Sequence, residues 1–344
     1  MTDGGESREN IAMDPHRRRL SRRAALGALL GSAALARRRP ALAQDFPSRP
    51  IRMVIPYPPG GASDVIARLL GPPMGEMLGQ PVVIENRPGG NGAIACELVA
   101  RSPADGYTLM MGNAGPNALN AALYGSRLTY DVIRDFTPIS LVSKVPMVIA
   151  AHPSTPANDL QALIALARAR NGELSYAHGG TGAAPHLMME QLASLKDFRW
   201  TAVPFRGGQL ALTAVLANQI PIVTDTAPVV LPHVKEGRLR GIAVSTAERV
   251  KQAPDLPTIA EQGYPGYEAT SWGGVLGPAN LPAPVAQRLH AAVVHGMTRP
   301  EVQAALDRQG VQVRTSSPEE FAAHIRAEVE RWTEVVQKAG IKPE

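Results

Sequence analysis

Short hydrophobic runs alternate along the chain with stretches whose hydrophobic positions recur at helical spacing, and this alternation is regular from residue 51 onward. Most of the short runs end in turns rich in glycine or proline, as strands do. The expected strands are 51–57, 81–86, 107–111, 145–150, 174–177, 201–205, 221–225 and 240–245. The expected helices are 65–78, 93–101, 158–170, 186–195, 209–218, a segment ending near Glu236, 284–297, 301–309 and 318–337.

Repeated units of strand, loop and helix predict an α/β fold in which a parallel sheet is wrapped by helices on both faces. Pro72 and Pro73 fall inside the first helix, and we expect them to kink or interrupt it. Ser317 and Pro318 give the last helix a favourable N-terminus. Beyond residue 43 the chain is long enough for two modest domains.

The first 43 residues have the pattern of an export signal. The basic residues of 17–23 precede the apolar run 24–36, and 41–43 (Ala-Leu-Ala) matches the A-x-A sequence that stands before a cleavage site. An apolar run of this length rises only about 20 Å as a helix, which is too short to span a hydrocarbon core of about 30 Å. A basic or amphipathic surface helix is the alternative interpretation of this segment.

The segment 21–26 (SRRAAL) also resembles a twin-arginine signal. With translation starting at Met1 or Met13, we expect export to the bacterial periplasm and cleavage of the signal peptide after Ala43. No cysteine stands at the expected cleavage site, so the sequence does not predict a lipoprotein anchor there.

Charge separates this leader from the rest of the chain. Nine of the 35 Lys and Arg residues and four of the 30 Asp and Glu residues lie in 1–43, which leaves 26 of each charge for 44–344. A nucleic-acid-binding protein is expected to carry its basic patch on the folded part. Aromatic residues make up only 4% of the chain, so stacking side chains are scarce as well. We therefore expect no nucleic-acid partner.

The sequence carries no familiar catalytic or metal-binding motif. It has no GxSxG, HExxH, P-loop or complete GxGxxG, and its histidines are scattered without metal-ligand spacing. The single cysteine, Cys96, excludes an intrachain disulfide, and its apolar helical surroundings predict a buried, unreactive thiol. We expect no catalytic residue, no metal and no cofactor.

Three glycine-rich turns follow expected strands and precede expected helices, at 57–64, 112–117 and 178–186. Glycine lets the backbone approach a ligand closely, and the free amides at a helix N-terminus attract an anion. Ligands of open α/β sheets bind at the carboxyl ends of the strands, so two such turns facing one cleft could hold a carboxylate without an arginine. Ordinary turn formation is the alternative for each loop. His178 and His186 flank the third turn, and either face a cleft or are satisfied inside the structure.

Taken in order, these stretches resemble the Bug receptors, the extracytoplasmic solute-binding proteins of the tripartite tricarboxylate transporter family. The resemblance covers almost all of the chain after residue 43, and the matching segments are 46–70, 79–113, 128–142, 203–246 and 253–285. The first of these reads FPSRPIRMVIPYPPGGASDVIARLL. Each glycine turn alone is a weak motif, whereas their order and spacing are specific.

The resemblance implies a periplasmic-binding-protein-like α/β fold, in which two Rossmann-like domains are joined by a double-crossover hinge. By similarity, domain 1 comprises 44–146 plus 270–344, and domain 2 comprises 147–269. The hinge strands would then be Ser143–Val148 and Thr270–Val275.

The resemblance also implies that a ligand carboxylate is gripped between the loops 57–64 and 179–186, largely by main-chain amides and ordered water. The expected ligand-binding residues are Tyr57, Pro59, Gly60, Gly61, Ala62, Ser63, Asp64, Asn113, Gly180, Thr181, Gly182, His186, Arg206 and Asp225.

Two of these residues have open alternatives. Arg206 either contacts the ligand or forms an ion pair with a neighbouring carboxylate, and Asp225 either caps the helix near Pro228 or accepts a hydrogen bond from the ligand. Where the family commonly carries hydroxyl side chains, this sequence has Phe205, Ala183 and Ala184. If those positions touch the ligand, the change favours a less polar one.

The implied function is that of a monomeric periplasmic receptor. It would capture a small carboxylate in the interdomain cleft for uptake by a tripartite tricarboxylate-type transporter, whose permease subunits are its possible membrane partner. Two alternatives stay open: a ligand-dependent periplasmic sensor, and a secreted hydrolase acting on a small acid. The hydrolase would need a nucleophile and base that the motifs do not supply.

Overall fold

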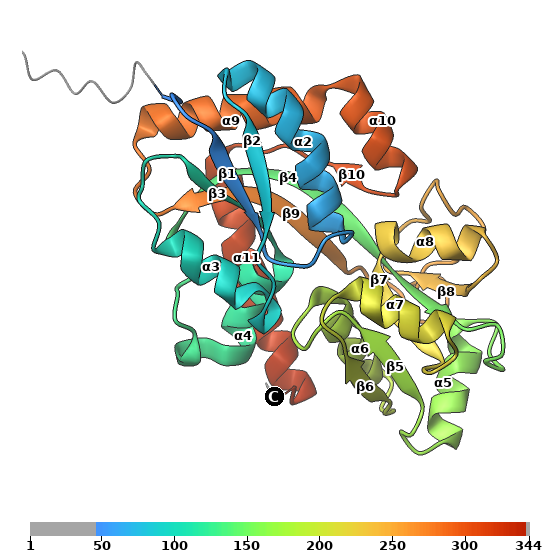
Figure 1. Ribbon diagram of the computed structural model, residues 1–344. Coiled ribbons are helices and arrows are strands. Elements are labelled where there is room, and N and C mark those ends of the chain that lie inside the picture. The colour runs from blue at the N-terminus through green and yellow to red at the C-terminus, as the bar shows by residue number, and fades with distance from the viewer. Residues whose placement is uncertain (1–45, 342–344) are drawn as a thin grey trace, which may run out of the picture. The chain divides into compact units, whose positions relative to one another are not determined.

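The computed structural model describes residues 46–341, and residues 47 onward form one compact unit. The predicted export signal and its cleavage site lie outside the described residues. None of the helices in the described part combines the length and the apolar character needed to cross a membrane. Figure 1 shows the arrangement of the strands and helices.

The strands and helices alternate over much of the chain, as the hydrophobic pattern predicts. The strands are β1 (Ile51–Ile55), β2 (Val82–Asn86), β3 (Thr108–Asn113), β4 (Phe136–Ala151), β5 (Ser175–His178), β6 (Thr201–Pro204), β7 (Ile222–Thr226), β8 (Arg240–Val244), β9 (Thr270–Pro278) and β10 (Gln312–Val313). The α-helices are α2 (Ala62–Leu78), α3 (Ala93–Ala100), α4 (Asn120–Tyr124), α5 (Leu160–Ala169), α6 (Ala184–Leu195), α7 (Gly208–Leu216), α8 (Ala227–Lys235), α9 (Ala283–Thr298), α10 (Pro300–Arg308) and α11 (Pro318–Ala339). Short 3-10 or π segments lie at Gly90–Gly92, Gly115–Leu119 and Gly125–Arg127.

The sheet is mixed, which corrects the expectation of a parallel sheet. Its main strand order is β2-β1-β3-β9-β4-β7-β5-β6, and β8 and β10 also pair with β4. The pairs that β1 makes with β2 and β3, and β5 with β6 and β7, are parallel. Every pair made by β4 or β9 is antiparallel. The repeated strand–helix units therefore form two parallel groups, and β4 and β9 run between them in the opposite direction.

The long strand β4 changes partners along its length. From Phe136 to Pro146 it pairs with β9, and from Met147 to Ala151 it pairs with β7 and β8. Figure 1 shows β4 running from one group of strands to the other. The change of partner falls between Pro146 and Met147, so the backbone of one strand belongs to both parts of the sheet.

Helix α11 packs across β9 near this change of partner. The rings of Trp272 in β9 and Phe321 in α11 are both buried and meet edge to face, with their centroids 5.5 Å apart. Gly274 makes the approach possible, because a Cβ on it would lie 2.1 Å from the Phe321 ring. The indole nitrogens of Trp272 and Trp332 both donate to Oε2 of the buried Glu328 at 3.2 Å. Burying a large apolar side chain contributes about 1.5–3 kcal/mol, so this cluster fixes α11 on β9.

Helix α2 runs through Pro72 and Pro73 without interruption, so of the two expected outcomes, a kink or an interruption, the interruption does not occur. A proline inside a helix lacks one N–H and crowds the carbonyl four residues earlier. Packing compensates, because α2 lies against α9, where a Cβ on Gly296 would be 2.6 Å from Cδ1 of Leu70. The helix is therefore held by a close tertiary contact that its own sequence does not reveal.

Candidate functional site

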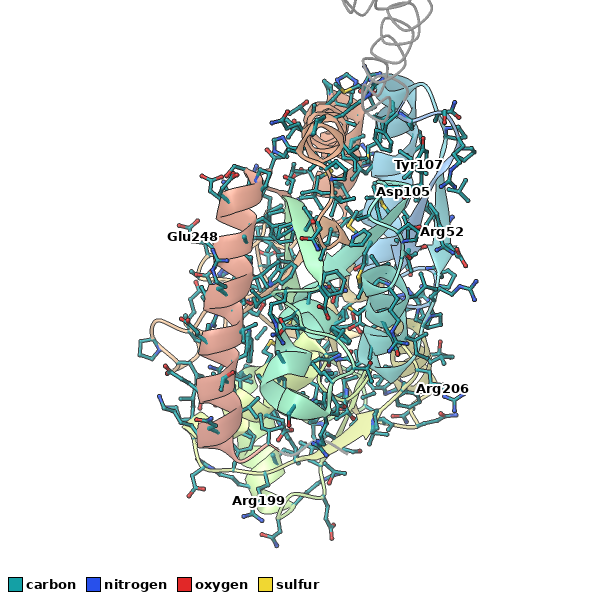
Figure 2. The ribbon with its side chains drawn as sticks, turned by 90° about the vertical axis from the view of Figure 1, so that its left-hand side faces the viewer. Arg52, Asp105, Tyr107, Arg199, Arg206 and Glu248 are labelled. Carbon is teal, nitrogen blue, oxygen red and sulfur yellow. The ribbon has the colours of Figure 1, made fainter. Side chains whose placement is uncertain are left out.

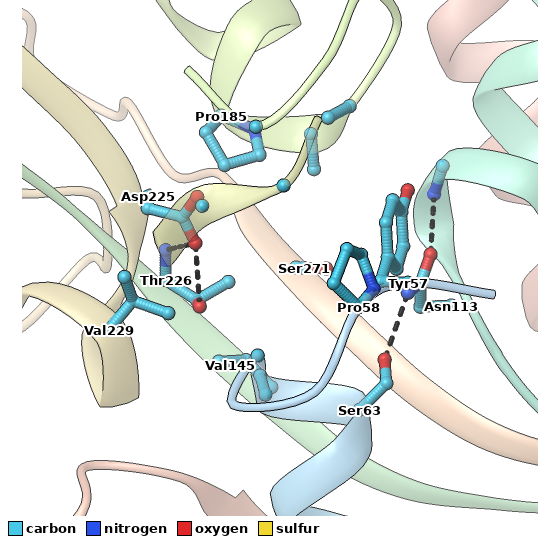
Figure 3. A pocket seen from close by; sticks show the side chains of 18 of the residues that line it. Tyr57, Pro58, Ser63, Asn113, Val145, Pro185, Asp225, Thr226, Val229 and Ser271 are labelled. Atoms are coloured by element: carbon cyan, nitrogen blue, oxygen red, sulfur yellow. Dashed lines mark hydrogen bonds between the residues drawn. The ribbon is translucent and has the colours of Figure 1, made fainter. Parts of the chain in front are cut away.

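A pocket of about 390 Å³ lies beside the carboxyl ends of β1, β3, β5 and β7. Figure 3 shows part of its wall, with Tyr57, Ser63 and Asn113 on one side and Asp225 and Thr226 on the other. The first turns of four helices and the beginning of β9 complete the wall. This volume is typical of a small-molecule site.

Four helices begin at this pocket, namely α2, α6, α7 and α8. Their N-cap residues are Gly61, Ala183, Gly207 and Thr226, and none of these forms a capping hydrogen bond through its side chain. Among the helices that begin elsewhere, α5 and α11 are capped by the side chains of Asp159 and Ser317, whereas α3, α9 and α10 also lack side-chain caps. Except at Pro185 in α6 and Pro228 in α8, which have no N–H, the first-turn residues of these helices offer their amides to an anion, and each such charge–dipole contact is worth about 0.3–2 kcal/mol.

The turn between β1 and α2 is held from beneath by Asp64. Its carboxylate accepts hydrogen bonds of 3.0 Å from the Gly60 N–H, from Nε of Arg68 and from Nδ2 of Asn86. Burial by itself would raise the pKa of Asp64, but these hydrogen bonds and the Arg68 charge outweigh it and lower the pKa. Asp64 thus stays ionised and shapes the turn, and it is not among the residues that line the pocket.

Ser63 and Asn113 form a polar corner of the pocket. Nδ2 of Asn113 donates to Oγ of Ser63 at 2.9 Å, while Oδ1 of Asn113 accepts from the Gly115 N–H at 3.1 Å. Because Ser63 accepts in this pair, its hydroxyl proton can be donated to a ligand. The partner of Ser63 is an amide and not a base, so this pair lacks the arrangement of an activated nucleophile.

Tyr57 lines the pocket while its hydroxyl points to a neighbouring loop. The hydroxyl donates to Oδ1 of Asn91 at 2.7 Å, and Nδ2 of Asn91 donates to Oδ1 of Asn120 at 3.0 Å. Gly115 leaves room for the hydroxyl, since a Cβ there would lie 2.5 Å from it. Burial raises the pKa of Tyr57 far above its ordinary value, so this group remains a neutral hydrogen-bond donor.

His178 and His186 are buried behind the glycine turn that precedes α6. Their rings stack with centroids 4.5 Å apart. Nδ1 of His178 accepts from the Gly180 N–H, and Nδ1 of His186 accepts from the Gly182 N–H, both at 3.2 Å. Burial lowers the pKa of His178 to about 3, with His186 as a further cause, and lowers the pKa of His186 to about 4. The two neutral imidazoles therefore shape the turn and do not line the pocket, but His178 is not fully satisfied, because its buried Nε2 has no hydrogen-bond partner among the described residues.

Asp225 lies at the end of β7 and is 8% exposed. Oδ1 accepts from the N–H of Thr226 at 2.7 Å and from its hydroxyl at 3.0 Å, as Figure 3 shows. Thr226 is the N-cap of α8, and its own N–H is not one of the first-turn amides of the helix, so the interpretation of Asp225 as the cap is wrong. Burial raises the pKa of Asp225 to about 6, although the bonds from Thr226 act against this.

Arg206 borders the pocket but is exposed. It forms no ion pair with any carboxylate of the described residues, so the alternative of an ion pair to a neighbouring carboxylate is wrong. Figure 2 shows its side chain at the surface, directed outward. The pocket therefore has no buried cationic side chain among its lining residues.

The structure brings part of the expected site together around one cavity. The expected residues that line it are Tyr57, Pro59, Gly61, Ala62, Ser63, Asn113, Arg206 and Asp225. The expected residues that do not line it are Gly60, Asp64, Gly180, Thr181, Gly182 and His186. Of the positions where the family commonly carries hydroxyl groups, Ala183 and Ala184 line the pocket and Phe205 does not.

Sequence reasoning missed most of the apolar wall and one helix start. The missed lining residues include Pro58, Ile66, Val145, Gly207, Gly208, Gln209, Leu210, Val229 and Trp272. The Gly207-Gly208 pair after an expected strand was an available signal for the start of α7, because it repeats the glycine-turn pattern. In the sequence alone, nothing distinguishes Val145, Val229 and Trp272 from ordinary core residues. No group of His, Cys, Asp and Glu suited to a metal ion occurs in the described part of the chain.

The mixed α/β fold and a pocket ringed by helix N-termini define the class of periplasmic-binding-protein-like solute-binding proteins. The solved periplasmic binding protein BugD superposes on this chain with a TM-score of 0.82 at 32% identity, covering 87% of this chain and 100% of that one. The Rpa4515 protein of R. palustris, solved with adipate, gives a TM-score of 0.83 at 35% identity, covering 87% of this chain and 100% of that one.

Sequence comparison leads to the same class. The model of the tripartite tricarboxylate transporter family receptor matches residues 66–341. Protein BugT of Bordetella pertussis is 33% identical over 320 residues, which are 93% of this chain and 97% of the relative. This chain belongs to the tripartite tricarboxylate transporter receptor family, a family of solute-binding receptors.

Proposed function

We propose that the pocket captures a small carboxylate in the periplasm for uptake by a tripartite tricarboxylate-type transporter. The observation that carries this proposal is the set of four helix N-termini that open on one pocket without side-chain caps. Their free amides suit an anion, and the lining provides no buried lysine or arginine to take that role. The adipate in the related R. palustris structure supports a carboxylate as the ligand.

Capture would work by closure of two domains, 44–146 plus 270–344 and 147–269. The exchange of partners along β4 after Pro146 supports a hinge at Ser143–Val148 and Thr270–Val275. Between the two proposed domains, Nε2 of Gln209 donates to the carbonyl oxygen of Gly60 at 3.0 Å. A ligand that binds both sides of the pocket would favour the conformation in which such contacts form.

Delivery from the periplasm requires export and a membrane partner. We expect the exported, monomeric receptor to present its loaded form to permease subunits. Replacing Arg22 and Arg23 by lysine tests the twin-arginine route, because that route depends on the arginine pair. Accumulation of uncleaved protein in the cytoplasm supports this route, and unchanged export contradicts it.

A thermal-shift screen with purified receptor tests the proposed ligand class. The panel contains dicarboxylates, tricarboxylates, amino acids and aromatic acids, with neutral amides and sugars of similar size as controls. A ligand at 100 times its dissociation constant adds about 2.7 kcal/mol to the free energy of unfolding. Stabilisation by acids and not by the neutral controls supports the proposal, whereas no stabilisation by any acid contradicts it.

A further inference from the structure

Ser271 carries the one pocket hydroxyl that has no hydrogen-bond partner among the described residues. Three further hydroxyl groups line the pocket, those of Tyr57, Ser63 and Thr226, and each forms a hydrogen bond with a neighbouring side chain. Ser271 is only 9% exposed, yet its Oγ is not sealed in the core but is open to the pocket. This hydroxyl is therefore free to bond a ligand.

The alternation of side chains along β9 turns Ser271 toward the pocket. Successive residues of a strand point to opposite faces of the sheet. A Cβ on Gly274 would lie 2.1 Å from the Phe321 ring, on the side of α11. A Cβ on Gly273 would lie 3.7 Å from Cδ1 of Ile66, which belongs to α2 and lines the pocket. Ser271 shares the face of Gly273, so its side chain stands on the floor of the pocket.

The neighbours of Ser271 on this floor leave its hydroxyl unbound. Its cross-strand partner on β4 is the apolar Val145, which also lines the pocket, and Gly273, two residues further along β9, has no side chain. Asn113 on β3 pairs with Gly273 from the other edge of β9. The amide group of Asn113 is already bonded to Ser63 and to the backbone. The bonding capacity of the Ser271 hydroxyl is thus left to whatever enters the pocket.

The position of this hydroxyl decides which ligands it favours. Figure 3 shows Ser271 between the wall that carries Asp225 and the wall that carries Tyr57, so a ligand that contacts both walls passes over it. Water can bond the hydroxyl when no ligand is present, but a hydrocarbon chain would displace that water and leave the hydroxyl unpaired, which lowers the affinity. A ligand hydroxyl restores the bond, because serine both donates and accepts. A site built to bond a hydroxyl rejects the analogue that lacks it.

We propose that Ser271 makes this receptor selective for hydroxy acids, that is, for small carboxylates with a hydroxyl on the carbon chain or ring that lies over the pocket floor. This inference rests on the proposed function, since it presumes that the helix N-termini hold the ligand's carboxylate. None of the ligand-binding residues expected from the sequence lies on β9, so this contact adds a strand to the site.

Isothermal titration of the purified receptor compares acids that differ by one hydroxyl. The pairs are built on straight-chain monocarboxylates and dicarboxylates and on aromatic acids, with the hydroxyl at each carbon in turn. On the skeleton that binds best, we expect one position at which the hydroxy acid binds at least about fivefold more tightly than the unsubstituted acid. A smaller advantage at every position overturns the inference and leaves the proposed function intact. Absence of binding by every acid overturns both.

The variant Ser271→Ala assigns the preference to one side chain. The two acids of the best pair should then bind within about twofold of each other, because neither gains nor loses a bond to the serine hydroxyl. Where Ser271→Ala does not fold, Ser271→Cys, which has a weaker hydrogen-bonding group of nearly the same size, serves the same comparison. A ratio that stays above about twofold overturns the inference.

Ser143→Ala is the matched control on the neighbouring strand β4. A Cβ on Gly273 would lie 2.7 Å from Oγ of Ser143, so this hydroxyl is on the same face of the sheet. It is buried without a hydrogen-bond partner among the described residues, and Ser143 does not line the pocket. The control should keep the wild-type ratio, since any change in closure acts on both acids alike. Loss of the ratio in Ser143→Ala also overturns the assignment to Ser271.

Discussion

The side chain of Gln209 donates a hydrogen bond from Nε2 to the carbonyl oxygen of Gly60 at 3.0 Å, across 149 positions of sequence. Beside it, Gly207 lies against Pro58, since a Cβ on Gly207 would be 3.0 Å from Cγ of Pro58. The start of α7 thus touches the β1–α2 turn directly. Both segments also line the pocket, so this contact connects the two walls between which we propose that the ligand is held.

Removing this hydrogen bond should weaken ligand binding without unfolding the protein. Gln209 is exposed, so Gln209→Ala loses about 0.5–1.5 kcal/mol of closed-state stability, which corresponds to about two- to tenfold in affinity. Isothermal titration with an acid found in the thermal screen measures the change. Gln219→Ala, at another exposed glutamine that follows α7, is the control and should bind as the wild type does. Equal affinities for the two variants would contradict a closing role for Gln209.

A side chain at Gly182 should weaken ligand binding, because it would collide with neighbouring atoms as well as strain the backbone. Its φ is +81°, and a Cβ on it would lie 2.6 Å from Cδ1 of Leu123 and 3.1 Å from Nδ2 of Asn91. Gly237 has a similar φ of +70° but no atom within 4 Å of the added Cβ. Both Gly→Ala variants carry backbone strain of about 1–2 kcal/mol. Only Gly182→Ala also prevents the close approach of the turn at Gly182 to Leu123 and Asn91. We expect Gly237→Ala to keep the wild-type affinity and Gly182→Ala to lose at least about tenfold.

Titration of both glycine variants, together with denaturant unfolding, separates the two effects. If Gly182→Ala and Gly237→Ala lose stability equally and bind the acid equally well, the contact with Leu123 has no part in binding.

The regular alternation of strands and helices made most of the fold predictable. The expected strand 81–86 and helix 318–337, for example, correspond to β2 and α11. The direction of β4 and β9 could not be predicted in the same way, because antiparallel pairing depends on partners distant in sequence. Phe136 to Val142 was missed as part of β4 because its hydrophobic pattern is interrupted by polar residues.

For the site, the glycine turns were predictive and individual side chains were not. A turn that exposes helix amides leaves a local signature, as Gly60-Gly61 does before α2. The role of a side chain depends on what lies beside it in the fold. Asp64 and His186 occur within those turns, yet their hydrogen bonds hold the turns from behind the pocket wall. Val145 and Trp272 border the pocket because β4 and β9 pass beneath it, which no local pattern indicates.

The free energy of unfolding should depend more on the hydrogen-bond acceptor Nδ1 of His186 than on the rest of the imidazole ring. His186→Leu would leave the buried Gly182 N–H without its acceptor, at a cost of about 1–3 kcal/mol in the free energy of unfolding. His186→Asn places an oxygen near the position of Nδ1 and should recover much of this loss. Urea unfolding measures both variants, and titration with the acid ligand tests whether the turn keeps its shape. Asn and Leu variants that are equally destabilised would contradict the importance of this hydrogen bond.

Asp225 should make the protein less stable as the pH rises. Its pKa is about 6 in the folded state against 3.8 for a free carboxyl. Between these values the folded state retains a proton that the unfolded state has lost, so unfolding becomes easier with rising pH, by about 3 kcal/mol in all above pH 6. Asp225→Asn carries no charge and avoids this loss. Urea unfolding of the ligand-free protein should therefore show a larger stabilisation by this variant at pH 8 than at pH 5, by about 1 kcal/mol. The same advantage for Asp225→Asn at both pH values would contradict the raised pKa.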